Sequence, residues 1–267
     1  MKVEVQEKIN KKELPIGFMD SGLGGLSVLK EAIKILPSED FIYYGDSKNA
    51  PYGTKTQDEI RKLTLDIVEK LVDQGIKGLV VACNTATSAA IKILREKYPD
   101  MPVLGIEPAI KPAVIHSHGG KILVLATPMT IKQQKFHILL DQYKDQANII
   151  PVSCEGLMEF VEEGNIFGHD LDEYFENHLS PYLDHVETIV LGCTHYPFLR
   201  PHLKKYLNSS SIKIIDGSLG TALELKRQLY KNDLLREHHK GHITIYNSTE
   251  KEDMMNLSYQ LLNMNIE

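Results

Sequence analysis

Two cysteines occupy matching places in the two halves of this chain. Cys83 follows the apolar run Gly78–Ala82, Cys193 follows the run Thr188–Gly192, and polar residues come directly after each cysteine. A thiol is a weak acid and its thiolate is a base. Two such groups on opposite sides of one carbon can remove a proton from one face and return a proton to the other. The chemistry that this pair predicts is the inversion of a stereocentre.

Other landmarks repeat with nearly the same spacing as the cysteines. Cys83 and Cys193 lie 110 positions apart, and the acids Glu107 and Asp216, which end the next strand of each half, lie 109 apart. Asp20 and Thr127, where the opening strands end, lie 107 positions apart. This regularity indicates a degenerate repeat of a whole domain. The alternative is that successive strand–helix units repeat by accident of their length.

The composition is typical of a globular protein and excludes several classes of function. The chain has 267 residues, of which 42% are hydrophobic and 25% charged, and its net charge is −6. This charge offers no basic surface to a phosphate backbone, so we expect no nucleic acid as partner. No apolar run approaches the ~20 residues that span a bilayer, so we expect no membrane partner. Three cysteines do not make a disulfide framework and suit a cytoplasmic location.

Strands and helices are expected to alternate along most of the chain. Short runs rich in β-branched residues predict strands near residues 15–20, 41–46, 78–83, 103–107, 122–127, 148–153, 188–193, 212–216 and 242–247. Helical patterns in most of the gaps favour parallel sheets covered on both faces. The fold class is therefore α/β, with two pseudo-symmetric, doubly wound domains. Because the repeat ends at Asp216, we expect one domain at 1–106 plus 217–267 and the other at 107–216.

Polar residues gather at the expected carboxyl ends of these strands. They are Asp20, Asp46, Cys83, Glu107, Thr127 and Cys193. Ligands bind at this end of open α/β sheets, so we expect the active site there, in the cleft between the two domains. Asp20 or Asp46 would then balance a substrate ammonium group or tune a thiol. A helix N-terminus after each cysteine should lower the thiol pKa, and should also lower the pKa of His195.

The glycine-rich turn from Asp20 to Ser27 invites a nucleotide-binding interpretation. The dinucleotide fingerprint needs glycines at the spacing G-x-G-x-x-G, but Gly22 and Gly24 are followed by Ser27. No lysine stands in a phosphate-loop position either. Backbone N–H groups at a helix N-terminus bind a carboxylate as readily as a phosphate. We favour a carboxylate here, with a phosphate as the alternative.

Other chemistries use less of the cysteine pattern. A free cysteine often only fills space in a core, and we expect this of Cys154. Cys193 and His195 have no second Cys/His pair at ligand spacing, so no metal site is expected. A Cys/His nucleophile for acyl or amide hydrolysis stays open, although it leaves Cys83 without a role. A two-lobed, non-catalytic amino-acid binding module also stays open.

Five short motifs, running in order from about residue 15 toward the C-terminus, carry a family resemblance. They are Asp20-Ser21-Gly-x-Gly-Gly, Tyr44-x-Asp46, Pro51-Tyr52-Gly53, Cys83-Asn84-Thr85-Ala86 and Gly192-Cys193-Thr194-His195-Tyr196-Pro197. The chain resembles the glutamate racemases of the aspartate/glutamate racemase family. The resemblance implies two similar α/β domains with the active site between them. It also implies interconversion of L- and D-glutamate without a cofactor, which supplies D-glutamate for peptidoglycan.

The resemblance further implies a role for each matching residue. Cys83 would act on D-glutamate and Cys193 on L-glutamate. Asp20 would support Cys83, while His195 and Glu162 would support Cys193. The substrate would be lined by Asp20, Ser21, Tyr52, Gly53, Asn84, Thr85, Thr127, Thr130, Thr194 and His195.

The stretch after Cys154 departs from the family pattern. The family often has a proline-rich Cys-Pro-x-x-Val-Pro sequence, where this chain has Cys-Glu-Gly-Leu-Met-Glu. Glu155 and Glu163 therefore stay open beside Glu162 as the acid that supports His195. The paired cysteine motifs favour glutamate over another amino acid such as aspartate. We expect a cytoplasmic homodimer that needs no metal.

Overall fold

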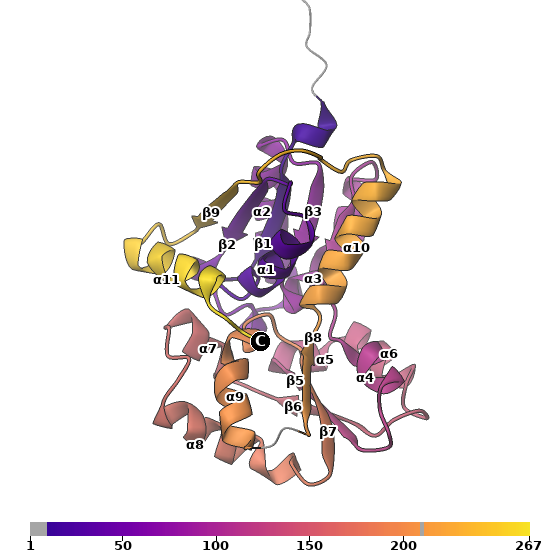
Figure 1. Ribbon diagram of the computed structural model, residues 1–267, viewed down its shortest axis with the longest axis vertical. Helices are drawn as coiled ribbons and strands as arrows, with labels where there is room; N and C mark the ends of the chain where they lie inside the picture. Colours follow the sequence, from indigo (N-terminus) through magenta and orange to yellow (C-terminus); the bar gives the residue numbers. More distant parts are fainter. Residues whose placement is uncertain (1–9, 209–210) are drawn as a thin grey trace, which may run out of the picture.

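Two parallel β-sheets, one in each lobe of the molecule, form the framework (Figure 1). This computed structural model describes residues 10–208 and 211–267. The first lobe, at the top of Figure 1, holds a sheet of order β4-β3-β1-β2-β9. Its strands are β1 (Ile16–Asp20), β2 (Phe41–Gly45), β3 (Gly78–Val81), β4 (Val103–Gly105) and β9 (Ile243–Asn247).

The second lobe repeats the strand order of the first. Its sheet has the order β6-β5-β7-β8, which corresponds to β2-β1-β3-β4, and β9 is an additional edge strand of the first sheet. Its strands are β5 (Lys121–Ala126), β6 (Ile149–Ser153), β7 (Val186–Leu191) and β8 (Lys213–Asp216). All neighbouring strands in both sheets are parallel. The predicted α/β class and the nine predicted strands are confirmed.

Helices cover the sheets and supply the other half of each core. The first lobe contains α1 (Leu26–Ile35), α2 (Gln57–Asp73), α3 (Asn84–Lys97), α10 (Ser218–Lys231) and α11 (Glu252–Asn263). The second contains α4 (Ile110–Ile115), α5 (Pro128–Lys132), α6 (Gln134–Asp141), α7 (Leu157–Glu162), α8 (His169–His178) and α9 (Arg200–Leu207). Short 3₁₀ helices are η1 (Lys11–Glu13), η2 (Ser47–Asn49), η3 (Tyr52–Thr54), η4 (Ser180–Tyr182) and η5 (Tyr196–Leu199). No helix in these described ranges is long and apolar enough to cross a membrane.

The central strand β1 shows why the first sheet is covered on both faces. All five of its residues are buried. Phe18 packs in one apolar cluster with Leu29 of α1, whereas its neighbour Met19 packs in another with Val68 of α2. Successive side chains of a strand point to opposite faces, so both faces must be apolar. The cluster around Phe18 continues into the second lobe as far as Phe198, and the lobes therefore share a core.

The chain crosses between the lobes at two neighbouring places, between β4 and α4 and between β8 and α10. A Cβ atom on Gly217 would lie 2.3 Å from the carbonyl oxygen of Glu107, so the two crossings run side by side. This closeness supports our proposal that the domains are 1–106 plus 217–267, and 107–216.

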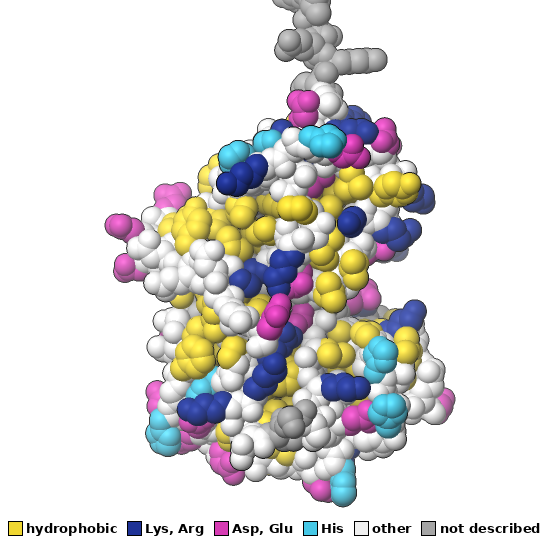
Figure 2. Space-filling view, viewed as in Figure 1, with side chains coloured by type: hydrophobic (Ala, Val, Ile, Leu, Met, Phe, Trp, Pro, Cys, Tyr) yellow, Lys and Arg dark blue, Asp and Glu magenta, His cyan; other side chains and the backbone are white. Residues whose placement is uncertain are grey.

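The C-terminal residues lie along the seam between the lobes. Arg200 of α9 donates a hydrogen bond to the carbonyl of Ile266 (3.2 Å), and Lys34 of α1 forms an ion pair with Glu267 (3.1 Å). Figure 2 shows basic and acidic side chains gathered on this seam. The C-terminus thus contacts both lobes, and its residue Ile266 is buried in the core cluster that the lobes share.

A buried ion pair at the amino ends of the first sheet generates a stability prediction. Lys77 and Glu39, which precede β3 and β2, form an ion pair with both side chains 1% exposed. Glu39→Ala leaves the Lys77 charge buried without its partner, so we expect a loss of about 3–5 kcal/mol of unfolding free energy. The matched control is Glu224→Ala, which breaks an exposed pair with Arg227 and should cost under about 1 kcal/mol.

Urea unfolding measures both variants, and catalytic activity per folded molecule should be unchanged in both. Equal losses of stability in Glu39→Ala and Glu224→Ala would contradict a structural role for the buried pair.

Candidate active site

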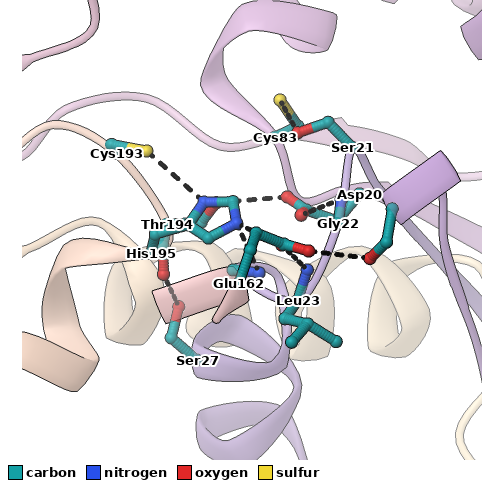
Figure 3. A network of polar contacts seen from close by, with 12 residues as sticks. Asp20, Ser21, Gly22, Leu23, Ser27, Cys83, Glu162, Cys193, Thr194 and His195 are labelled. Carbon is teal, nitrogen blue, oxygen red and sulfur yellow. Dashed lines mark hydrogen bonds and ion pairs between the residues drawn. The ribbon is translucent and has the colours of Figure 1, made fainter. Parts of the chain in front are cut away.

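Corresponding strand ends of the two sheets supply the residues of the site. Asp20 ends β1 and Cys83 follows β3, while Thr127 follows β5 and Cys193 follows β7. In each sheet the two strands are neighbours, and the chain winds away from them in opposite directions. Ligand sites of open α/β sheets lie at such switch points. Both switch points contribute to one network of polar contacts across the lobes (Figure 3).

Cys83 lies in an environment that keeps its thiol protonated. It is the N-cap residue of α3, its sulfur lies 3.5 Å from the N–H of Ala86, and the hydroxyl of Ser21 lies 3.3 Å away. Burial, and next the charge of Asp20, raise the pKa of Cys83 to about 12. The helix N-terminus was expected to lower this pKa, but burial and Asp20 have the larger effect. These surroundings therefore favour the protonated thiol of Cys83.

Cys193 belongs to a different arrangement, with a histidine and a carboxylate. Its sulfur lies 3.6 Å from Nδ1 of His195, and Nε2 of His195 lies 2.8 Å from Oε1 of Glu162. Of the three acids left open by the sequence, Glu162 is the one in contact with His195. Burial acts to raise the pKa of Glu162, but hydrogen bonds from His195 and Leu23 lower it overall. An ionised carboxylate only accepts hydrogen bonds, so the contact of 2.8 Å with Glu162 favours a proton on Nε2 of His195. The backbone N–H of Gly24 also lies 3.2 Å from Nε2, on the first-lobe side of the ring.

The pKa of His195 shifts in the direction opposite to the one expected from the sequence. Burial acts to lower it, but the contacts with Cys193 and Glu162 raise it well above its usual value. The expected helix begins after His195 as the 3₁₀ helix η5, which continues directly into α9. The contacts with Cys193 and with the Glu162 carboxylate therefore outweigh the dipole of the following turn. An imidazolium Nδ1–H can donate its hydrogen bond to the sulfur of Cys193.

Hydrogen bonds across the lobes hold these groups in one place. The hydroxyl of Thr194 donates to Asp20 (3.1 Å), and the hydroxyl of Ser27 donates to the carbonyl of Thr194 (2.9 Å). The backbone N–H of Leu23 donates to Oε1 of Glu162 (2.5 Å). Asp20 is fully buried, and burial raises its pKa although the charge of His195 acts in the opposite direction. The structure thus shows the two lobes closed on the site.

The glycine-rich turn makes room for second-lobe side chains. A Cβ atom on Gly22 would lie 2.0 Å from Oε1 of Glu162, and one on Gly24 would lie 2.4 Å from Nδ1 of His195. The N–H groups of Gly22 and Leu23 donate to Asp20 and Glu162. The anions held by these two N–H groups are therefore carboxylates of the protein itself, and the glycine spacing is explained without a phosphate.

Most of the remaining expected residues surround the two cysteines. Tyr52 is buried and its hydroxyl donates to Asp46 (2.8 Å). A Cβ atom on Gly53 would lie 3.4 Å from Thr127, so η3 packs directly on the second lobe. The hydroxyl of Thr130 lies 3.0 Å from that of Thr127 and 3.4 Å from that of Thr85. These three hydroxyls form a second chain of contacts between the lobes.

Asn84 is the residue of the site with an unused polar atom. It is 7% exposed, and its side-chain oxygen is buried without a hydrogen-bond partner among the described residues. It lines a cavity of about 160 Å³ together with Thr130 and Lys135. A buried polar atom without a partner is costly, and a ligand group could supply the missing bond.

A wider groove of about 1060 Å³ lies at the lobe crossings, and neither cysteine lines it.

Comparisons with known proteins agree with this geometry. Residues 16–222 match the family model described as Asp/Glu/Hydantoin racemase. A glutamate racemase of Clostridium botulinum (strain Loch Maree / Type A3) is 53% identical over 258 residues, which cover 96% of this chain and 100% of that protein. The chain belongs to the Asp/Glu/hydantoin racemase family. The resemblance found in the sequence motifs is confirmed, and the protein is an isomerase.

Solved structures of this racemase family share the fold over nearly the whole chain. The glutamate racemase isoform of Bacillus anthracis superposes with a TM-score of 0.83 at 31% identity, covering 96% of both chains. The enzyme of Francisella tularensis, solved with D-glutamate, superposes with a TM-score of 0.81 at 29% identity, again covering 96% of both chains.

Sequence reasoning did not single out Ser27 or Ser47 as parts of this racemase site. Ser27 was considered only because it interrupts the glycine spacing, yet its hydroxyl bonds to Thr194 across the lobes. Ser47 follows Asp46 directly after β2, and its hydroxyl donates to Glu162. The position of Ser47 just after the carboxyl end of a strand was the feature of the sequence that could have identified it as a site residue.

A test of the packing between the turn and His195 is the variant Gly24→Ala. Its added methyl group would push against His195 and Thr194, so we expect racemase activity to fall at least about 100-fold, as small displacements of catalytic groups do. The control is Gly220→Ala on α10, where a Cβ atom meets nothing within 4 Å and should be neutral or stabilising. Activity and melting temperature are measured together. Full activity in Gly24→Ala would show that this close packing is not needed.

Proposed function

We propose that this racemase interconverts L- and D-glutamate by two opposed thiols, without an added cofactor. The observation that carries the proposal is the position of Cys83 and Cys193 after the corresponding strands β3 and β7, at one closed site. In Figure 3 Cys193 lies to the left of Cys83, beside His195, and Cys83 lies above Asp20, beside Ser21. The pKa of Cys83 also responds to the charge of Cys193, as expected for neighbouring sulfurs. Relatives that match nearly the full chain are glutamate racemases, which supports glutamate as the substrate.

The reaction from L- to D-glutamate needs one thiolate and one thiol. The sulfur of Cys193, as thiolate, takes the α-proton of L-glutamate, and the electron pair stays on the α-carbon. Cys83, as thiol, gives its proton to the opposite face and becomes a thiolate. Nδ1–H of His195 would donate a hydrogen bond to the Cys193 thiolate before the transfer. The protonated state of Cys83 described above suits this direction.

Conversion of D-glutamate runs through the same groups with the protons exchanged. Cys83 would then be the base and Cys193 the acid, so the free protein must lose a proton at one sulfur and gain one at the other. The carboxyl of Asp20, whose pKa burial raises, is our proposed support for Cys83. Burial of both sulfurs excludes water from the site while the carbanion exists.

Substrate binding is assigned to the polar groups around the two sulfurs. Hydroxyls and amides there would donate charge-assisted hydrogen bonds to the substrate carboxylates. The proposed binding residues are Asp20, Ser21, Tyr52, Gly53, Asn84, Thr85, Thr127, Thr130, Thr194 and His195. The unpartnered side-chain oxygen of Asn84 is available to accept a bond from the substrate ammonium group.

The product suggests a biological role for the chain. D-glutamate is a component of peptidoglycan, and the family resemblance supports a role in supplying it for the cell wall. A cytoplasmic location and a homodimer are part of the same proposal. The family model also covers aspartate and hydantoin racemases, so aspartate is the second candidate substrate.

Circular dichroism of amino-acid solutions tests the reaction and the substrate together. With the purified protein and no added cofactor, the optical signals of L-glutamate and D-glutamate should both decay to zero. L-aspartate, incubated in parallel, should keep its signal. Decay of the aspartate signal alone would transfer the proposal to aspartate, and no decay with glutamate would refute it.

Replacement of each cysteine tests the opposed thiols. Cys83→Ser and Cys193→Ser should each abolish racemisation, because the serine hydroxyl has a far higher pKa and is a poor base. Each variant should still expel the leaving group from one enantiomer of a β-substituted glutamate, since elimination needs one base. The two variants should prefer opposite enantiomers, and the same preference in both would refute the opposed arrangement. Cys154→Ala is the control, because the proposed mechanism assigns no role to its thiol.

His195 is expected to act at the Cys193 step alone. His195→Asn should lower kcat/KM about 100-fold, the scale of a lost acid–base group. The loss must be the same in both directions, because the ratio of the two kcat/KM values equals the equilibrium constant, which is unity for a racemisation. The asymmetry should be visible in primary isotope effects on kcat/KM. The effect should rise with α-deuterated L-glutamate and fall with α-deuterated D-glutamate. Equal shifts with the two substrates would make His195 a structural residue.

A further inference from the structure

A pair of polar residues from the first lobe lies behind Glu162, on the side away from His195. Ser47 of η2 donates a hydrogen bond from its hydroxyl to Oε2 of Glu162 (2.8 Å). Asn247, the last residue of β9, donates from its side-chain amide to the hydroxyl oxygen of Ser47 (2.9 Å). Asn247 is 6% exposed. Neither residue belongs to the motifs that identified the site.

The direction of these hydrogen bonds is fixed by chemistry. The side-chain oxygen of Asn247 accepts two bonds from Thr249, one from its N–H (3.0 Å) and one from its hydroxyl (2.8 Å). The amide nitrogen of Asn247 must therefore face Ser47, and it can only donate. The oxygen of Ser47 accepts that bond, so its hydroxyl proton points to Glu162.

Glu162 consequently receives hydrogen bonds at both of its oxygens. Oε1 accepts from Leu23 and His195, and Oε2 accepts from Ser47. Bonds donated to a carboxylate stabilise its ionised form and fix its orientation. The Ser47 bond is among those that lower the pKa of Glu162. An ionised, fixed Glu162 holds the imidazole ring of His195 against Cys193.

We propose that Ser47, whose hydroxyl is oriented by Asn247, is a positioning residue for the proton transfer at Cys193, acting through Glu162 and His195. The inference rests on the proposed two-thiol function. It connects β9, at the far edge of the first sheet, to one of the two thiols and leaves the other thiol untouched.

The two loops that carry Ser47 and Asn247 have other bonds that keep them together. The N–H of Lys48 donates to the hydroxyl of Ser248 (2.9 Å), and the N–H of Ser248 donates to the carbonyl of Gly45 (2.9 Å). Removal of the Ser47 hydroxyl therefore leaves the loop pairing intact. Ser248→Ala is the matched control, because it removes a hydroxyl from the same loops that does not reach Glu162.

The first experiment compares Ser47→Ala, Ser47→Thr and Ser248→Ala with the wild-type protein, using L- and D-glutamate. Ser47→Ala should lower kcat/KM about tenfold, the scale of one hydrogen bond to a charged group. Ser47→Thr keeps the hydroxyl and should stay within about twofold, as should Ser248→Ala. In Ser47→Ala the primary isotope effect should rise with α-deuterated L-glutamate and fall with α-deuterated D-glutamate, as predicted for His195→Asn. A loss of packing alone would not move the two isotope effects in opposite directions.

The second experiment uses the direction of the Asn247 bond. Asn247→Asp replaces a donor by an acceptor of the same shape, so the Ser47 proton turns toward the introduced carboxylate and away from Glu162. Asn247→Ala removes the donor but leaves the Ser47 proton free to bond to Glu162. We therefore expect Asn247→Asp to lower kcat/KM about tenfold, with the opposed isotope shifts, and Asn247→Ala to lower it less than about threefold. The melting temperature of each variant is measured alongside.

The outcomes separate this inference from the proposed function. If the wild-type protein does not racemise glutamate, both the proposed function and the positioning role of Ser47 are refuted. An active wild type with Ser47→Ala and Ser248→Ala alike in kcat/KM and isotope effects overturns the positioning role alone. If Ser47→Ala does not fold, the Asn247 pair decides, and equal losses in Asn247→Asp and Asn247→Ala overturn the proposal.

Discussion

The rest of the site depends on one buried carboxylate that joins the two lobes. Glu162 comes from α7 of the second lobe, yet two of its three hydrogen-bond donors, Leu23 and Ser47, belong to the first. Its third donor is His195, beside Cys193. A carboxylate that is buried among donors stays ionised, and it loses those donors if the lobes separate. Closure of the lobes and the electrostatic state of His195 are therefore coupled through a single side chain.

The two thiols have different surroundings although the topology of the two lobes is repeated. The strand orders β2-β1-β3-β4 and β6-β5-β7-β8 correspond, and a cysteine follows the third strand in both. Cys193 has a histidine with a carboxylate behind it, whereas Cys83 has the hydroxyl of Ser21 and a buried Asp20. One thiol is thereby placed beside a cation and the other beside a carboxyl group. In the proposed mechanism the two sulfurs hold one proton between them, and such a difference would favour one thiolate and one thiol.

The sequence predicted the framework well because its signals are local. Each β-branched run bounded by polar residues or glycine became a strand, and the cysteine corners followed from the strand ends. The missed features depend on contacts between distant residues. Leu23 and Ser47 lie 139 and 115 positions from Glu162, so no local pattern could pair them. The raised pKa of His195 depends in part on such a contact, because the distant Glu162 raises it together with the nearby Cys193. The need for glycine at position 24 also comes from a distant residue, because a Cβ atom there would collide with the ring of His195.

The most direct test of two opposed thiols is the fate of the α-hydrogen in heavy water. L-glutamate is converted in D₂O to a small extent, and both isomers are recovered and analysed for deuterium at the α-carbon. With separate donors and acceptors, the D-glutamate formed should carry solvent deuterium while the remaining L-glutamate keeps its hydrogen. The same result in mirror image is expected from D-glutamate. Product that retains the original α-hydrogen would contradict the assignment, because one base would then have moved a single proton across the carbon.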